Sequence, residues 1–87
     1  MINLKWSPTA AEDLAYWKKN DAKKYRKILA LCDSIRMDPK HGLGKPEPLK
    51  HELSGCWSRR IDQKNRLVYR FDDDDEMVYI LQAGGHY

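Results

Sequence analysis

Two strand-like runs, Cys56-Trp-Ser-Arg-Arg-Ile61 and Arg66-Leu-Val-Tyr-Arg-Phe71, decide the fold together with the polar residues between them, Asp62-Gln-Lys-Asn65. Such a polar segment between two strand-like runs is typical of a β-hairpin turn. Because side chains alternate between the faces of a strand, one face of the second run should pack on a core and the other should stay open. The core face carries Leu67, Tyr69 and Phe71, and the open face carries Arg66, Val68 and Arg70.

Two helices precede this hairpin. The first is expected from Ser7-Pro8 to about Lys19, since Ser7 can cap a helix and proline at the first position loses no needed N–H. Thr9 with Glu12 offers a competing capping box. The candidates for the buried side of this helix are Ala11, Leu14, Ala15 and Trp17.

The second helix follows an interruption at Asn20-Asp21 and runs to about Met37. Asp38-Pro39 ends it, because the residue before a proline is disfavoured in helical geometry. Three- and four-residue spacings define its apolar face. That face consists of Tyr25, Ile28, Cys32 and Ile35, with Leu29 and Leu31 beside it.

A strand at Ile2–Trp6 and another at Met77–Ala83 complete the order β-α-α-β-β-β. The segment from His41 to Leu49 contains two glycines and two prolines, so we expect an irregular, stiffened loop. The prediction is a single α+β domain over residues 1–87, with two helices on one face of a twisted antiparallel sheet. The acidic run 72–76 then lies at a solvated hairpin tip.

The net charge of +3 conceals an uneven distribution. Five of the thirteen acidic residues lie in 72–76, so the remainder carries sixteen Lys and Arg against eight Asp and Glu. Such a surface attracts polyanions, although solubility alone also explains it. The basic start of the second helix is a candidate contact for RNA or simply a solvated face; its cations are Lys23, Lys24, Arg26 and Lys27.

Several classes of protein are disfavoured by the sequence. Cys32 and Cys56 are isolated from each other and from histidines at ligand spacing, so we expect reduced thiols rather than a disulfide or a zinc site. No apolar run approaches the roughly 20 residues of a membrane span, and the start does not resemble a signal peptide. We expect a cytoplasmic protein without a metal or other cofactor.

Three features of the sequence suggest phosphodiester chemistry. Glu47 lies between two prolines that restrict its backbone, Arg66 lies on the open face of the sheet, and His86-Tyr87 follows the last strand. RNA cleavage by its own 2′-hydroxyl needs a base, a cation at the phosphorane-like transition state and an acid for the 5′-oxygen. Further cations expected to bind RNA phosphates are Lys45, Arg59, Arg60 and Arg70. Arg59 and Arg60 point to opposite faces of their strand, so only one of them can join the patch of Arg66 and Arg70.

A family resemblance rests on strings spread along the whole chain. They are Gly44-Lys-Pro-Glu-Pro-Leu-Lys-His51, Leu53-Ser-Gly55, Trp57-Ser-Arg-Arg-Ile61, Arg66-Leu-Val-Tyr69 and His86-Tyr87, with Trp6-Ser7 and Tyr16-Trp17 near the start. In this order they resemble the YoeB/Txe toxins of the RelE superfamily. The resemblance implies a bacterial type II toxin that cuts mRNA in the A site of the 70S ribosome and stops translation.

The resemblance also implies roles for individual residues. Glu47 is similar to the general base of the family, His86 to the general acid and Arg66 to the arginine that stabilises the phosphate. Tyr87 resembles the terminal tyrosine that orients the substrate, and Lys50 an auxiliary charge at the scissile phosphate. Family members often carry an acid and a histidine where this chain has Lys64-Asn65, and bulkier residues where it has Gly84-Gly85.

The implied partners are an antitoxin of the YefM/Axe kind and the ribosome with its mRNA. Operator DNA is an expected partner only through the toxin–antitoxin complex. A homodimer is supported if Trp17 is exposed, whereas a buried Trp17 belongs to the core. Two alternatives stay open: a binding module without catalytic activity, and, disfavoured by the missing ligand cluster, a metal-dependent nuclease.

Overall fold

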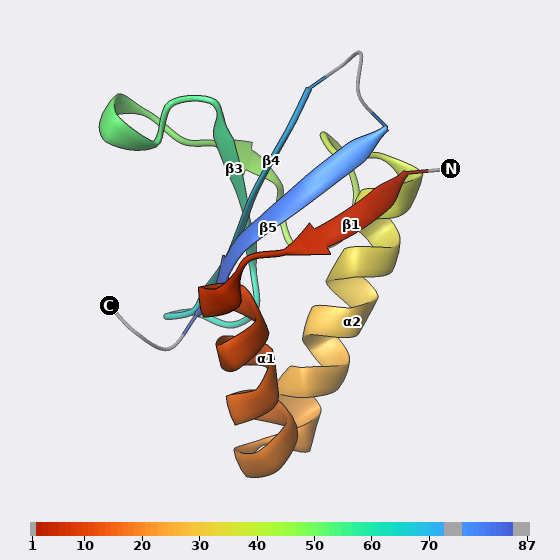
Figure 1. Cartoon of the computed structure of the whole chain (residues 1–87), viewed down its shortest axis with the longest axis vertical. Helices are drawn as coiled ribbons and strands as arrows, with labels where there is room; N and C mark the ends of the chain where they lie inside the picture. The colour runs from red at the N-terminus through yellow and green to blue at the C-terminus, as the bar shows by residue number, and fades with distance from the viewer. Residues whose placement is uncertain (1, 73–75, 85–87) are drawn as a thin grey trace.

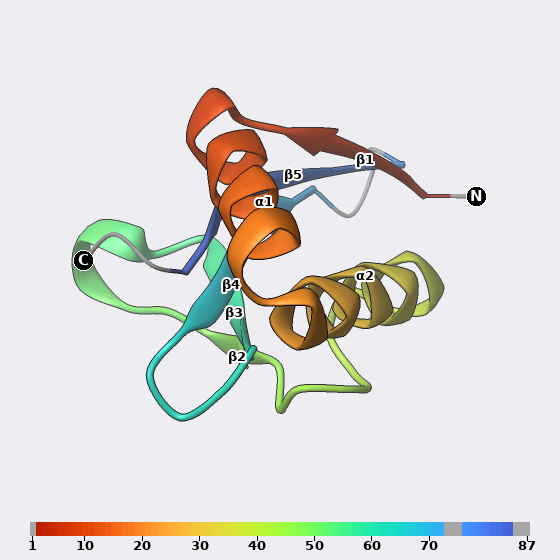
Figure 2. The ribbon, with the colours of Figure 1, turned by 90° about the horizontal axis from the view of Figure 1, so that it is seen from below.

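The computed structural model describes residues 2–72 and 76–84 of the chain. Its elements are β1 (Asn3–Trp6), α1 (Pro8–Asn20), α2 (Ala22–Met37), β2 (Glu47–Pro48), the 3₁₀ turn η1 (His51–Leu53), β3 (Cys56–Arg60), β4 (Arg66–Phe71) and β5 (Met77–Ala83). Figure 1 shows both helices on the same side of the sheet. In Figure 2, turned by 90°, α1 and α2 again lie side by side, and they pack on each other. The predicted α+β fold is confirmed.

The sheet is mixed rather than wholly antiparallel, which corrects the prediction. Its strand order is β1-β5-β4-β3-β2. β1 runs parallel to β5, with Asn3 opposite Met77 and Trp6 opposite Ile80, whereas the other three pairs are antiparallel. A parallel pair needs a long connection. Here both helices and three strands lie between its two members.

The helix ends follow their capping residues. The Ser7 hydroxyl accepts a hydrogen bond from the Ala10 N–H at 3.0 Å, so α1 begins in the Ser7-Pro8 register and not in the alternative one. Asp21 caps α2 by accepting from the Lys24 N–H at 3.2 Å. The C-terminal end of α2 at Met37 confirms the stop predicted from Asp38-Pro39.

The buried face of α1 differs from the predicted one. Ala10 and Asp13 are buried and Leu14 and Trp17 half-buried, whereas Ala11 and Ala15 are exposed. These four inward positions have the spacing i, i+3, i+4 and i+7 of one helix face, but a polar Asp13 in the set concealed the pattern. On α2 the predicted face is largely correct, with Ile28, Leu31, Cys32 and Ile35 buried and Leu29 exposed.

Trp17 belongs to the core and not to a free aromatic surface. Its side chain packs against the buried cluster, and its indole N–H donates to the Ala83 carbonyl at 2.8 Å. Both cysteines are free thiols. Burial raises the pKa of Cys32 to about 11, so its thiol stays protonated at neutral pH. No helix in the described part of the chain is long and apolar enough to span a membrane.

The segment predicted as an irregular loop contains a short strand. β2 pairs with β3, placing Glu47 opposite Ser58 and Pro48 opposite Trp57. The Leu49 N–H donates to the Cys56 carbonyl at 2.8 Å just beyond it. Proline, which lacks an N–H, is tolerated on such an edge strand. This pairing fixes the backbone of Glu47 to the sheet.

Candidate active site

Four residues form a row across the sheet on the face away from the helices. Glu47 of β2 lies opposite Ser58 of β3, Ser58 opposite Val68 of β4, and Val68 opposite Gln82 of β5. Residues paired across neighbouring strands project to the same face. The row therefore brings Glu47 onto the face that the sequence had assigned to Arg66.

A hollow of about 260 Å³ lies over this row, and we call it the site hollow. Its lining consists of Glu47, Leu49, Leu53, Ser58, Lys64, Arg66, Val68 and Gln82. Leu49 and Leu53 come from the segment around η1, while Ser58 and Val68 are buried beneath. A carboxylate, a guanidinium and an ammonium thus share one shallow surface with an apolar floor.

The guanidinium of Arg66 is held by the β3–β4 turn. Its Nη1 donates to the carbonyls of Asp62 at 2.7 Å, Gln63 at 3.2 Å and Asn65 at 3.2 Å. These acceptors are backbone atoms of a hydrogen-bonded turn, so the side chain has a defined direction at the edge of the hollow. A planar guanidinium in a fixed direction suits an anionic phosphate.

Glu47 faces solvent at the rim of the hollow. Its side chain is exposed, and the neighbouring prolines together with the β2–β3 pairing restrict its backbone. The carboxylate can therefore reach a polar ligand above the sheet without being buried itself. Lys50, predicted as an auxiliary charge, is exposed at the start of η1 and does not line the hollow.

Arg59 does not belong to a phosphate-binding patch, and the prediction for this residue is wrong. Its side chain is fully buried beneath the opposite face of the sheet, where Arg59 pairs with Leu67. Its guanidinium donates five hydrogen bonds of 2.7–3.0 Å, to Ser34 Oγ, Tyr69 Oη and the carbonyls of Asp38, His41 and Leu43. A guanidinium has five N–H donors, so this set leaves none for a ligand.

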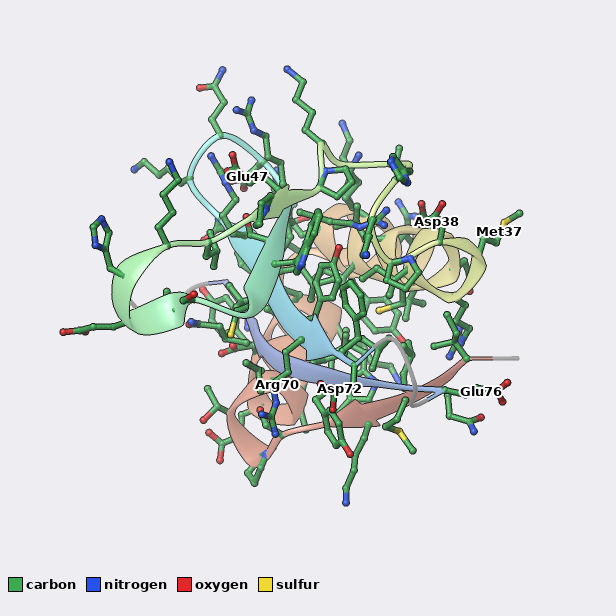
Figure 3. All side chains as sticks on the ribbon, turned by 90° about the horizontal axis from the view of Figure 1, so that it is seen from above. Met37, Asp38, Glu47, Arg70, Asp72 and Glu76 are labelled. Atoms are coloured by element: carbon green, nitrogen blue, oxygen red, sulfur yellow. The ribbon has the colours of Figure 1, made fainter. Side chains whose placement is uncertain are left out.

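The remaining predicted phosphate ligands lie outside the site hollow. Arg60 is exposed opposite Arg66 and lines a neighbouring hollow of about 390 Å³ together with Lys45 and Lys27. Arg70 lies over the Tyr79 ring at 5.0 Å and borders another depression beside β1. Figure 3 shows Glu47 and Arg70 well apart. Arg66 and Arg70 therefore line different depressions of the surface.

The four basic residues at the start of α2 gather around one surface depression. Lys23, Lys24, Arg26 and Lys27 line it together with Ile61, and Lys27 and Ile61 also line the hollow of Lys45 and Arg60. Lys24 forms an ion pair with Asp62 at 3.2 Å. The basic helix and the hairpin thus share one continuous cationic surface beside the site.

His86 and Tyr87 lie outside the described residues. The chain is described up to Gly84, which directly follows β5. Gln82, two residues before Gly84, lines the site hollow.

Sequence reasoning missed Ser58 and Gln82, which line the hollow between Glu47 and Arg66. The period of two in the hairpin places Ser58 opposite Val68, so this signal was present. The position of Gln82 was harder to find, because an irregularity between Val68 and Tyr69 shifts the β4–β5 register. Among residues 2–72 and 76–84, no three His, Cys, Asp or Glu side chains gather as a metal site.

The family model for YoeB-like toxins of bacterial type II toxin–antitoxin systems matches residues 6–87. The chain belongs to this toxin family. It is 49% identical over 87 residues to the protein named Toxin YoeB of Mycobacterium bovis, and the match covers 100% of both chains.

Solved structures of the family share the fold. The YoeB/ParE toxin from Agrobacterium tumefaciens has a TM-score of 0.92 at 37% identity, over 99% of this chain and 100% of that one. The YoeB–YefM complex from Staphylococcus aureus has a TM-score of 0.88 at 41% identity, over 100% of this chain and 99% of that one. The YoeB dimer of the same organism has a TM-score of 0.86 at 42% identity, over 99% of this chain and 98% of that one.

Proposed function

We propose that this YoeB-family toxin is a metal-independent endoribonuclease that cuts mRNA in the ribosomal A site. The observation that supports it most directly is the shared lining of the site hollow by Glu47 and Arg66. Their separation in sequence is bridged by the row of paired residues across the sheet. His86 lies two residues beyond Gly84 in the sequence, and Gln82, two residues before Gly84, lines the hollow.

In the proposed reaction the 2′-hydroxyl of the substrate attacks the adjacent phosphorus. Glu47 takes the proton of this hydroxyl as the 2′-oxygen–phosphorus bond forms. Arg66 stabilises the negative charge that develops on the non-bridging oxygens. His86, as imidazolium, gives a proton to the 5′-oxygen as the phosphorus–5′-oxygen bond breaks. Tyr87 orients the substrate, and Lys50 adds positive charge near the phosphate.

The test is cleavage of mRNA on translating 70S ribosomes, with mapped RNA ends. Glu47→Ala, Arg66→Ala and His86→Ala should each lower the cleavage rate by about 10²–10⁴-fold and relieve growth arrest in bacteria that lack the antitoxin. Glu52→Ala is the matched control, because it removes an exposed acid of η1 that does not line the hollow.

Three outcomes contradict the proposal. Ribosome binding without cleavage by the unaltered protein favours the binding module. Loss of cleavage on addition of EDTA contradicts the metal-free reaction. Full toxicity of Arg66→Ala removes Arg66 from its proposed role.

We further propose a YefM/Axe-type antitoxin as the partner, since a solved relative is a YoeB–YefM complex. Its C-terminal segment covers the site hollow and blocks access of mRNA, and the complex represses its own operon by binding the operator. A cytoplasmic location follows from a ribosomal target. The YoeB dimer from Staphylococcus aureus makes a homodimer an additional proposal for this chain.

A further inference from the structure

The β3–β4 turn is organised around the carboxylate of Asp62. Asp62 Oδ1 accepts from the backbone N–H of Lys64 at 2.7 Å and of Asn65 at 2.6 Å. Asp62 Oδ2 accepts from Asn65 Nδ2 at 2.9 Å and lies 3.2 Å from Lys24 Nζ. Asn65 is thus bound to the same carboxylate through both its backbone and its side chain.

This turn holds the beginning of β4 as well. The carbonyls of Asp62 and Asn65 both accept from Arg66 Nη1. The Ile61 N–H donates to the Asn65 carbonyl at 2.9 Å and closes the hairpin. The position of the Arg66 guanidinium and the position of Asn65 therefore depend on one set of bonds.

Asn65 also contacts the end of β5. Gly84 is buried with a φ of +77°, and a Cβ built on it lies 2.8 Å from Asn65 Cβ and 3.2 Å from Asn65 Oδ1. No residue with a side chain fits there unless the turn moves. The preceding residue is fixed too, because the Ala83 N–H donates to Asp13 Oδ2 at 2.9 Å and its carbonyl accepts from Trp17.

We propose that Asn65, locked by Asp62 and packed against Gly84, is a positioning residue that fixes where the chain leaves β5 toward His86. The inference rests on the function proposed above, in which His86 is the general acid. The amide side chain of Asn65 and the absence of a side chain at Gly84 together allow this contact.

The experiment compares single-turnover mRNA cleavage on programmed ribosomes for two variants and one control. Asn65→Ala removes the side-chain bond to Asp62, and Gly84→Ala introduces the colliding methyl group. Gly55→Ala is the matched control, because Gly55 has a φ of +94° but open space around its Cβ. We expect the maximal single-turnover rate constant to fall at least tenfold for the first two, with the concentration that gives the half-maximal rate nearly unchanged, and to stay within twofold for the control.

A second substrate identifies the step affected. Replacing the 5′-oxygen at the cleaved bond by sulfur gives a leaving group that needs no proton, since a thiol is far more acidic than an alcohol. On this substrate Asn65→Ala and Gly84→Ala should recover to within about threefold of the unaltered protein, as should His86→Ala. Arg66→Ala should not recover.

Each result separates the inference from the function on which it rests. If the unaltered protein cuts and both folded variants cut equally fast, the positioning role is wrong and the ribonuclease stands. If the variants are slow and sulfur does not restore them, the defect lies elsewhere in the site and the inference fails. If the unaltered protein does not cut, both proposals fail. Should Gly84→Ala not fold, Asn65→Ala alone decides.

Discussion

Arg59 shows how a single charged side chain can stabilise the fold instead of binding a ligand. Its five acceptors are uncharged oxygens from α2, from the segment that follows it and from β4. Burying a charge is costly unless every donor is satisfied. The bonds therefore tie residues 38–43 to the sheet, and they hold the path of the chain toward Glu47.

Arg59→Lys should lower the free energy of unfolding by about 3 kcal/mol, because an ammonium cannot replace five bonds made in one plane. Urea denaturation measures the change. Arg60→Lys, at an exposed position on the same strand, should stay within about 0.5 kcal/mol. Equal effects of the two substitutions contradict a structural role for Arg59.

At the scale of elements, the β3–β4 turn depends on one ionised carboxylate. Partial burial raises the pKa of Asp62, but hydrogen bonds from Asn65, Lys64 and Lys24 outweigh it and hold the pKa well below its ordinary value. A depressed pKa in the folded state stabilises the protein above the unfolded pKa of about 4. That contribution is lost as the pH falls further, toward the pKa of the folded state.

Asp62→Asn should therefore cost about 1–2 kcal/mol of unfolding free energy at pH 7 and progressively less below pH 4. Denaturation of both proteins between pH 7 and pH 2.5 measures the difference. Asp72→Asn, which removes an exposed carboxylate, should leave stability nearly unchanged at each pH. If the loss of unfolding free energy caused by Asp62→Asn does not vary with pH, the ionised Asp62 carboxylate does not stabilise the turn as argued.

The elements predicted from sequence were those that local patterns determine. Backbone preferences of neighbouring residues set the helix and hairpin boundaries at Ser7-Pro8, Asp38-Pro39 and the turn around Asp62. The parallel pairing of β1 with β5 depends on the arrangement of the whole chain, and no local pattern encodes it. That the Arg59 side chain points into the core could be predicted only from the register of β3 against β4, which pairs Arg59 with Leu67.

The candidate site was predictable to a similar extent. Glu47 and Arg66 were identified from residue chemistry and resemblance, and the structure places them around one hollow. The contact of Gly84 with Asn65 joins residues on different strands, so it emerges only in three dimensions.

At the scale of the whole molecule, the cations form one surface that extends from the start of α2 to the hairpin. If this surface binds ribosomal RNA, Lys23→Gln with Arg26→Gln should weaken binding to 70S ribosomes about tenfold at low salt. The dependence of log affinity on log salt should also become shallower by roughly 1.5, for two lost phosphate contacts.

This effect is measured as the affinity of the variants for ribosomes over a series of potassium chloride concentrations. Each variant is made in a Glu47→Ala background. Lys5→Gln with Lys19→Gln removes the same charge from exposed positions on β1 and α1. Equal losses in the two pairs indicate long-range attraction only, and contradict a specific contact by α2.

The pairing of β1 with β5 has a consequence for how the toxin is made. Because the first strand finds its neighbour only in residues 77–83, the sheet cannot close while those residues are still inside the ribosome that synthesises the chain. A nascent chain therefore lacks the finished sheet on which the site hollow is built. Under the function proposed above, the protein therefore cannot attack its own messenger until residues 77–83 have left the ribosome.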